Sequence, residues 1–141
     1  MPLRAFLDGQ DGEIRLPVPG YLIKHSKGMV LFDSGLNTDL QQPESERNHL
    51  ITRRFRPEFI AGEELTARLS RCEVDVAKVR YLINSHLHFD HSGGNRQVTN
   101  ARLVVQQREW TAGHEPDLIQ SNGFALEDYD HGHDLELING E

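Results

Sequence analysis

The first third of the chain alternates short apolar runs with turn-forming residues, a pattern that predicts β-structure. Tyr21–Lys24 and Met29–Phe32 are apolar runs of strand length, and the turn-forming Ser26–Gly28 between them favours a hairpin. Ile14–Val18 alternates only weakly, and its proline suits an edge or irregular strand. We therefore expect the hairpin to be the first regular part of a sheet.

A helical period follows at residues 60–69, where apolar side chains recur at helical spacing. Glu63 and Glu64 would lie in the first turn, where acidic side chains interact favourably with the helix dipole. Residues 37–56 are polar and weakly patterned, so they could hold either a helix or a long excursion over the active face.

The second half predicts two further strands. Val79–Ile83 is short and almost wholly apolar, which is typical of a strand buried on both faces. Leu103–Val105 is another buried strand, and Arg108–Trp110 begins a short helix. Residues 113–141 are polar and carry several turn signals. This order predicts an α/β (α+β) fold, a mixed sheet covered by helices, in a single domain over residues 1–141.

Composition and charge limit the classes of molecule that the protein is expected to bind. The chain of 141 residues is 37% hydrophobic and 26% charged, which is ordinary for a soluble globular protein. Its net charge of −7 argues against nucleic acid as the main partner, because phosphate binding needs a basic surface. The one basic run, Arg53–Arg56, is interpreted as a solvated face or as part of a substrate rim.

The cysteine count and the length of the apolar runs indicate where in the cell the protein is expected. Cys72 is the only cysteine, so no intramolecular disulfide can form, and we expect it to be a small core residue. No stretch approaches the length of a membrane span, and the first twelve residues lack the apolar region of a signal peptide. We expect a cytoplasmic protein without a membrane partner, and the sequence gives no indication of its oligomeric state.

The histidines are unevenly distributed. Of the eight in the chain, three lie within His86-Leu87-His88-Phe89-Asp90-His91, directly after the predicted strand that ends at Ile83. Residues two apart in extended backbone point the same way, so His86 and His88 can converge on one metal ion. Asp90 and His91 follow a turn of the chain and can face a second position nearby. The cluster predicts a site for two divalent cations.

Two cations at such a site would serve hydrolysis. Water is a poor nucleophile at neutral pH, and a bound metal lowers its pKa to about 7. Two metals roughly 3.5–4 Å apart can bridge a hydroxide and hold a substrate oxygen. The motif therefore predicts a dinuclear metal hydrolase.

The motif also resembles a known family. His-x-His-x-Asp-His followed by Gly-Gly, as in residues 86–94, resembles the signature of the metallo-β-lactamase superfamily. Residues 85–95 closely resemble its N-acyl homoserine lactone lactonase branch, the quorum-quenching enzymes. The segments similar to the same branch are 21–25, 30–35, 104–110 and 130–137. The resemblance implies an αββα sandwich with the metals at one edge of the sheets.

The resemblance assigns roles to particular residues. It implies that His86 and His88 bind the first metal, and that Asp90 and His91 bind the second. Asp90 would also orient the attacking hydroxide. The second motif position is a histidine rather than a glutamate, which favours zinc over the di-iron chemistry of other relatives.

Two neighbouring residues have less definite roles. Phe89 occupies a position where relatives place an aromatic side chain against the substrate, although it could equally be a packing residue between ligands. Asp33 matches a strand-end aspartate near the metals. We expect it to support a ligand or to be purely structural rather than to bind metal itself.

The implied reaction is hydrolysis of a lactone or ester bond, with an N-acyl homoserine lactone favoured as the small-molecule substrate. Thioester and aryl-ester hydrolysis remain open, because the same ligands serve all of these reactions. A nuclease is disfavoured by the acidic charge balance.

The family's later ligands do not occur in these residues. The resemblance implies a histidine in a Gly-His-x-x-Gly-His-like stretch, an aspartate that bridges both metals and a final histidine. We therefore expect residues 1–141 to be the first half of the domain, apparently truncated, as a shortened product or an incomplete gene model. The alternative to a hydrolase is a truncated, non-catalytic metal-binding fragment.

The remaining histidines have simpler interpretations. His131 and His133 could chelate a metal locally, but the resemblance makes them part of a surface connection. His25, His49 and His114 stand alone and are expected at the surface or at the edge of the core.

Overall fold

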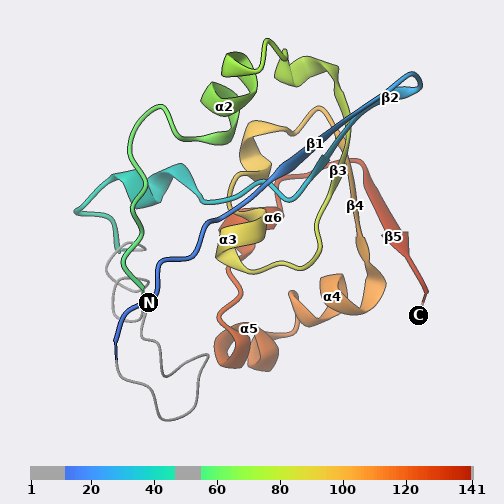
Figure 1. The fold of residues 1–141 in the computed structure, drawn as a ribbon. Helices are drawn as coiled ribbons and strands as arrows, with labels where there is room; N and C mark the ends of the chain where they lie inside the picture. The colour runs from blue at the N-terminus through green and yellow to red at the C-terminus, as the bar shows by residue number, and fades with distance from the viewer. Residues whose placement is uncertain (1–11, 47–54, 141) are drawn as a thin grey trace.

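The computed structural model describes residues 12–46 and 55–140, and its strands form one sheet in the order β1-β2-β3-β4-β5. The first two strands pair as an antiparallel hairpin, and each later strand runs parallel to the one before it. The mixed sheet that the sequence predicts is thereby confirmed (Figure 1). The strands are β1 (Tyr21–His25), β2 (Gly28–Phe32), β3 (Val79–Ile83), β4 (Arg102–Gln106) and β5 (Leu135–Ile138).

Short helices connect the strands, and Figure 1 shows them gathered on one side of the sheet. Parallel neighbours require such crossover connections, because a tight turn can join only antiparallel strands. The α-helices are α2 (Leu65–Arg71), α3 (Phe89–Ser92), α4 (Gln107–Ala112), α5 (Pro116–Asn122) and α6 (Leu126–Tyr129). The 3-10 helices are η2 (Thr38–Gln41), η3 (Val76–Lys78) and η4 (Asn95–Gln97).

A row of leucines forms the centre of the core. The strand register places one leucine from each strand side by side: Leu22, Leu31, Leu82, Leu103 and Leu135. The three central members of this row are at most 2% exposed. They pack with Leu69 of α2 and with Trp110 of α4, so the helices cover this face of the sheet. The alternation of side chains along each strand commits this leucine face to the interior.

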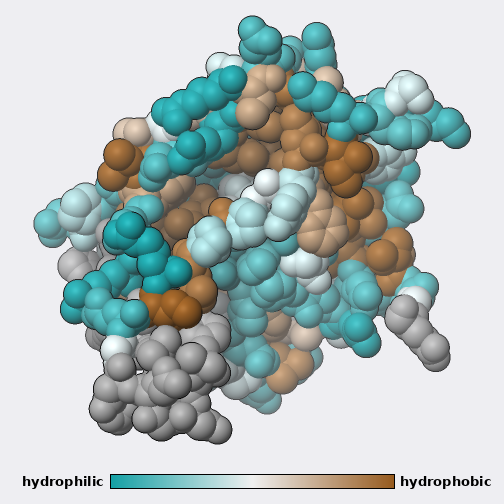
Figure 2. Space-filling model, in the orientation of Figure 1, coloured by the Kyte–Doolittle hydropathy of each residue, from teal (hydrophilic) through white to brown (hydrophobic). Residues whose placement is uncertain are grey.

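The opposite face of the sheet is largely apolar but not buried. Its apolar side chains include Tyr21, Ile23, Val30, Phe32, Tyr81, Ile83 and Val104, none of which belongs to the buried class. The register also places Arg102 and Glu136 on this face. Tyr21 is 59% exposed and Ile23 is 50% exposed. Figure 2 shows hydrophobic surface along the strands at the right of the view. The prediction that Val79–Ile83 is buried on both faces is therefore wrong for one of its two faces.

The structure confirms the predicted positions of the hairpin and the central strands, but the predictions for residues 14–18 and 60–69 need correction. Ile14–Val18 forms no strand. Its proline fixes a backbone dihedral and removes a hydrogen-bond donor, so a weak alternation is not enough to form a strand. The predicted helix over residues 60–69 begins at Leu65, with Glu64 as its N-cap. The two glutamates therefore precede the helix, and Ile60 is 69% exposed.

The polar C-terminal region contains more regular structure than its turn signals predict. Pro116 opens α5, and Gly123 ends it with a left-handed backbone (φ 71°), so one of the turn signals of this region, Asn122-Gly123, marks the end of a helix. The edge strand β5 has only Leu135 half-buried, which explains why its apolar pattern is weak. The predicted short helix at Arg108–Trp110 is confirmed by α4.

The lone cysteine lies at the surface rather than in the core. Cys72 is the C-cap of α2, one residue beyond the last helical turn, and is exposed. The apolar stripe of this helix ends at Leu69, so continuing its period to Cys72 gave a wrong prediction. Among the described residues, none of the helices is long and apolar enough to cross a membrane. The run Arg53–Arg56 falls largely outside the described residues, and so does His49.

The leucine row and the open face predict losses of stability of different size when a side chain is truncated. Leu82→Ala should lower the free energy of unfolding by about 2–5 kcal/mol, because it leaves a cavity in a fully buried position. Ile23→Ala, in the same sheet but half-exposed, should cost about 1 kcal/mol or less. Urea unfolding of both variants measures the difference. Equal losses would contradict the assignment of the two faces.

Candidate metal site

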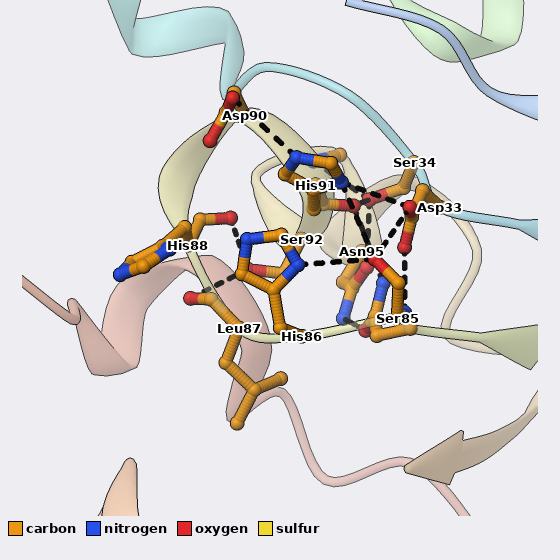
Figure 3. A network of polar contacts seen from close by, with 12 residues as sticks. Asp33, Ser34, Ser85, His86, Leu87, His88, Asp90, His91, Ser92 and Asn95 are labelled. Carbon is orange, nitrogen blue, oxygen red and sulfur yellow. Dashed lines mark hydrogen bonds and ion pairs between the residues drawn. The ribbon is translucent and has the colours of Figure 1, made fainter. Parts of the chain in front are cut away.

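The four predicted ligands lie where β2, β3 and α3 meet at the C-terminal edge of the parallel strands. Asp33 follows β2, the histidine motif follows β3, and α3 contains Asp90 and His91. The Asp33 backbone has a positive φ of 58°, which aspartate tolerates better than most residues. The sharp turn there directs its side chain toward the motif (Figure 3).

The Asp33 carboxylate joins these segments. It is 4% exposed, and its Oδ1 accepts a hydrogen bond from the Ser85 backbone N–H at 2.8 Å. Its Oδ2 accepts from the Ser85 hydroxyl at 2.8 Å and lies 2.9 Å from Nδ1 of His91. A buried carboxylate needs such partners, because its desolvation is costly. Asp33 thereby fixes the position of the His91 ring.

This contact determines which ring nitrogen of His91 can bind a metal. An ionised Asp33 can only accept, so Nδ1 carries the proton when the pair is hydrogen-bonded. Nε2 then keeps its lone pair, and it lies 3.5 Å from Oδ2 of Asp90. A histidine held by a carboxylate on one nitrogen is a common arrangement for a metal ligand.

The histidines at positions 86 and 88 flank a buried leucine. Leu87 is fully buried against Val105 and Tyr129, while the two histidines on either side of it are only half-buried. The His86 ring centroid lies 4.8 Å from that of His88 and 4.0 Å from that of His91. The three imidazoles therefore form one group, in which the His91 ring lies closer to His86 than the His88 ring does.

The surroundings of His86 favour its neutral form. Burial lowers the pKa of His86 below its usual value, and the neighbouring His91 and His88 lower it further. A nearby carboxylate, Asp90, acts in the opposite direction but more weakly. Metals bind the neutral imidazole, so this environment suits a ligand.

The donor set suits zinc chemically, but the side chains do not form a complete ligand shell. Three imidazoles and one carboxylate are a donor set that zinc prefers. In the part of the chain that the structure describes, no three histidine, cysteine or acidic side chains are placed to hold one metal ion. Nε2 of His88 instead lies 3.0 Å from the Asn122 carbonyl oxygen, and its ring stacks on Phe124 at 5.2 Å.

A buried network of amides and hydroxyls positions α3. The His91 carbonyl accepts hydrogen bonds from the Ser34 backbone N–H at 2.7 Å and from the Asn84 side chain at 3.2 Å. Asn95 donates to the Asn84 amide oxygen at 2.7 Å and accepts from the Ser34 hydroxyl at 2.7 Å. Ser34, Asn84 and Asn95 are all at most 5% exposed. The network, much of it visible in Figure 3, fixes the backbone next to the candidate ligands.

The two glycines after the motif allow the backbones to approach closely. A Cβ atom on Gly93 would lie 2.4 Å from the Asn37 nitrogen, and one on Gly94 would lie 2.3 Å from the Ser34 carbonyl oxygen. Both distances are shorter than atoms tolerate. A Gly-Gly pair permits either a tight turn or close packing, and the structure shows close packing.

A cavity of about 2120 Å³ opens beside the histidines. It is larger than the roughly 300–1,000 Å³ of typical ligand pockets. Part of it is open to solvent, so it is a groove rather than a closed site. Its wall includes Phe89, whose ring centroid lies 5.5 Å from that of Phe55, together with the apolar Leu16 and Val18. Phe89 therefore borders the groove and also contacts another aromatic ring.

Sequence reasoning missed the residues that support the site. Ser34, Asn84, Ser85 and Asn95 carry no spacing signal of their own, although each borders a predicted element. Glu109 was also missed, and its carboxylate accepts a hydrogen bond from the Leu87 N–H at 2.9 Å. All of these residues except Asn84 lie in segments that resemble the lactonase branch, but the resemblance gave them no role, and polarity next to a strand end or a motif was their only other signal.

The isolated histidines mostly lie where they are expected. His25 is exposed and accepts from the Lys27 N–H, and His114 is half-buried against Trp110. His131 and His133 lie in a connection whose other residues are exposed, but their own rings are half-buried. Within the described residues, Nε2 of His131 is buried without a hydrogen-bond partner, and the His133 ring lies beside the Asn95 and Val98 backbone. Burial also lowers the pKa of His133.

Comparison with known proteins identifies the family. The model of the metallo-beta-lactamase superfamily matches residues 14–137, and the chain therefore belongs to this superfamily. N-acyl homoserine lactonase AttM from Azorhizobium caulinodans is 31% identical over 124 residues, which are 86% of this chain and 46% of that protein. N-acyl homoserine lactonase AiiA from Bacillus thuringiensis subsp. kurstaki is 32% identical over 106 residues, 70% of this chain and 40% of its own.

Solved structures give the same result. A quorum-quenching N-acyl homoserine lactone lactonase superimposes with a TM-score of 0.79 at 25% identity, covering 99% of this chain and 52% of that one. An N-acyl homoserine lactone hydrolase with the product N-hexanoyl-L-homoserine bound at its catalytic metal centre gives 0.77 at 27% identity, covering 96% and 52%. The chain has the metallo-β-lactamase fold and spans about half the length of the relatives that it matches.

Close packing at Gly94 predicts a large effect of a small substitution. Gly94→Ala should lower the free energy of unfolding by about 1–3 kcal/mol, because the new methyl group would overlap the Ser34 carbonyl oxygen. Gly140→Ala is the matched control, since a Cβ there meets nothing within 4 Å. Urea unfolding measures both. A Gly94 variant as stable as the control would show that the approach is not required.

Proposed function

We propose that the protein is a metal-dependent hydrolase of a lactone or ester bond, with an N-acyl homoserine lactone as the favoured substrate. The observation that carries the proposal is the group of three imidazole rings, 4.0 and 4.8 Å apart, beside Asp90. The similarity to N-acyl homoserine lactonases supports the substrate class. Aryl-ester and thioester hydrolysis by the same fold are the alternatives within the class.

The residues that would hold the metals are His86, His88, Asp90 and His91. The favoured cofactor is a pair of zinc ions, because imidazoles dominate the donor set. When bound, zinc lowers the pKa of water and polarises a carbonyl oxygen. We assign the first ion to His86 and His88 and the second to Asp90 and His91, with Asp90 also orienting the attacking water.

The chain's own residues would prepare this site in three ways. Asp33 holds His91 through Nδ1 and leaves Nε2 available. Phe89 would contact the apolar part of the substrate, since it borders the open groove. Leu87, which is fully buried, keeps the two flanking histidines on the side that faces the groove.

A second candidate function is supported by two observations. The described donors do not complete a ligand shell, and the chain spans about half the length of its lactonase relatives. On this alternative, residues 1–141 are an incomplete metallo-β-lactamase-like domain that binds zinc without turning over a lactone.

Zinc binding tests the element that both candidates share. His86→Ala and His88→Ala should each weaken zinc affinity by more than the roughly 10–100-fold lost when an outer partner of a ligand is removed. The affinity can be measured by competition with a chromophoric chelator. His25→Ala is the matched control, because this exposed histidine lies at the far end of β1. Unchanged affinity in both ligand variants would contradict the assigned ligands.

Measuring substrate hydrolysis distinguishes the metal-dependent hydrolase from the zinc-binding domain without turnover. The zinc-loaded chain is assayed with a hexanoyl homoserine lactone, an aryl ester and a β-lactam, with the His86→Ala variant as background. Lactone hydrolysis above that background supports the hydrolase. Zinc binding without turnover of any of the three supports the second candidate, and absence of zinc binding contradicts both.

A further inference from the structure

The acidic side chain at position 109 contacts the middle of the histidine motif. Its Oε1 accepts a hydrogen bond from the Leu87 backbone N–H at 2.9 Å. Glu109 lies in the first turn of α4, which packs against β4 and β5. The carboxylate is therefore held by an element that belongs to neither the motif nor the strand before it.

The hydrogen bond from Leu87 to Glu109 restrains a segment that is no longer paired with a neighbouring strand. The last ladder bond on this segment joins the Asn84 N–H to the Val104 carbonyl at 3.0 Å. Beyond this residue no strand of the described sheet pairs with the chain, although the backbone must stay extended for His86 and His88 to face the same side. The Glu109 side chain supplies the hydrogen-bond acceptor that the Leu87 N–H lacks from the sheet.

The Leu87 side chain secures the same peptide from the other direction. It is fully buried in a cluster with Val105 and Tyr129, against which Trp110 packs. Trp110 is the residue after Glu109, so α4 contributes both a polar and an apolar contact to the peptide between the two histidines.

We propose that Glu109 is a positioning residue for the His86–His88 pair and so controls how tightly this pair binds zinc. The inference rests on the proposed metal site. Its carboxylate acts through geometry, by fixing the Leu87 peptide, and does not touch the reacting atoms. The length of the side chain is therefore expected to matter more than its charge.

Two conservative variants separate length from charge in the 141-residue chain. Glu109→Gln keeps an acceptor oxygen at the same reach, and we expect zinc affinity close to that of the unsubstituted chain. Glu109→Asp keeps the charge but is one methylene shorter, so it should weaken zinc binding about 10–100-fold, as Glu109→Ala should. Glu115→Ala, an exposed glutamate before α5, is the matched control.

A second readout tests the position of the rings without zinc. In ¹H–¹⁵N spectra of the imidazoles, the His88 signals should shift in Glu109→Asp and Glu109→Ala and much less in Glu109→Gln; the His86 signals also respond to the Glu109 charge, so they are compared between Glu109→Asp and the unsubstituted chain, which share that charge. Circular dichroism checks that each variant is folded at the temperature used. A merely structural role would lower thermal stability and leave the affinity and ring signals of the folded chain unchanged.

The outcomes distinguish this inference from the proposed function. If the unsubstituted chain binds no zinc, the metal site itself is contradicted, and the ring signals still decide whether Glu109 positions the histidines. If the chain binds zinc and Glu109→Asp binds it equally well with unshifted ring signals, the positioning role is overturned while the metal site stands.

Discussion

The contact between Asp33 and His91 is the interaction on which the rest of the site depends. One buried carboxylate, at the end of β2, accepts from the backbone and hydroxyl of Ser85 and lies 2.9 Å from the His91 ring. It thereby ties the strand end, the loop after β3 and helix α3 together. Burial of the carboxylate is tolerable because each oxygen has a partner, and the partners include the residue that the site must orient.

The contact between Asp33 and His91 requires the backbone after β2 to lie close to helix α3. For Asp33 to reach His91, the segment after β2 must run against α3, and the hydrogen bond from the Ser34 N–H to the His91 carbonyl requires the same approach. Only residues without a Cβ fit at positions 93 and 94. The Gly-Gly pair and Asp33 thus serve the same close packing of the two segments. These supporting residues position the site together with the candidate ligands.

The sequence could predict the parts of this structure whose signals are local. The β1–β2 hairpin follows from two apolar runs around a turn, and β3 follows from Val79–Ile83. The metal-binding pattern is confined to six consecutive residues, and the superfamily is confirmed by the family match over residues 14–137. The assignment of individual ligands stays a prediction.

What could not be predicted depends on contacts between distant residues. Asn95 supports the site through Ser34, 61 positions away, and Glu109 reaches Leu87 across 22 positions. Neither contact produces a periodic pattern in the sequence from which it could be predicted. The strand β5 pairs parallel to β4 as an exposed edge, so its burial pattern is weak, and Cys72 follows a helical period one step past the helix end.

Anomalous scattering from crystals of the zinc-loaded chain, recorded at the zinc edge, tests the central claim most directly. We expect two peaks, one beside the His86 and His88 rings and one beside Asp90 and the His91 ring, on the side of His91 that faces away from Asp33, with the Asp33 contact to Nδ1 preserved. A zinc ion bound elsewhere, or one that displaces Asp33 and binds Nδ1 of His91, would contradict the account.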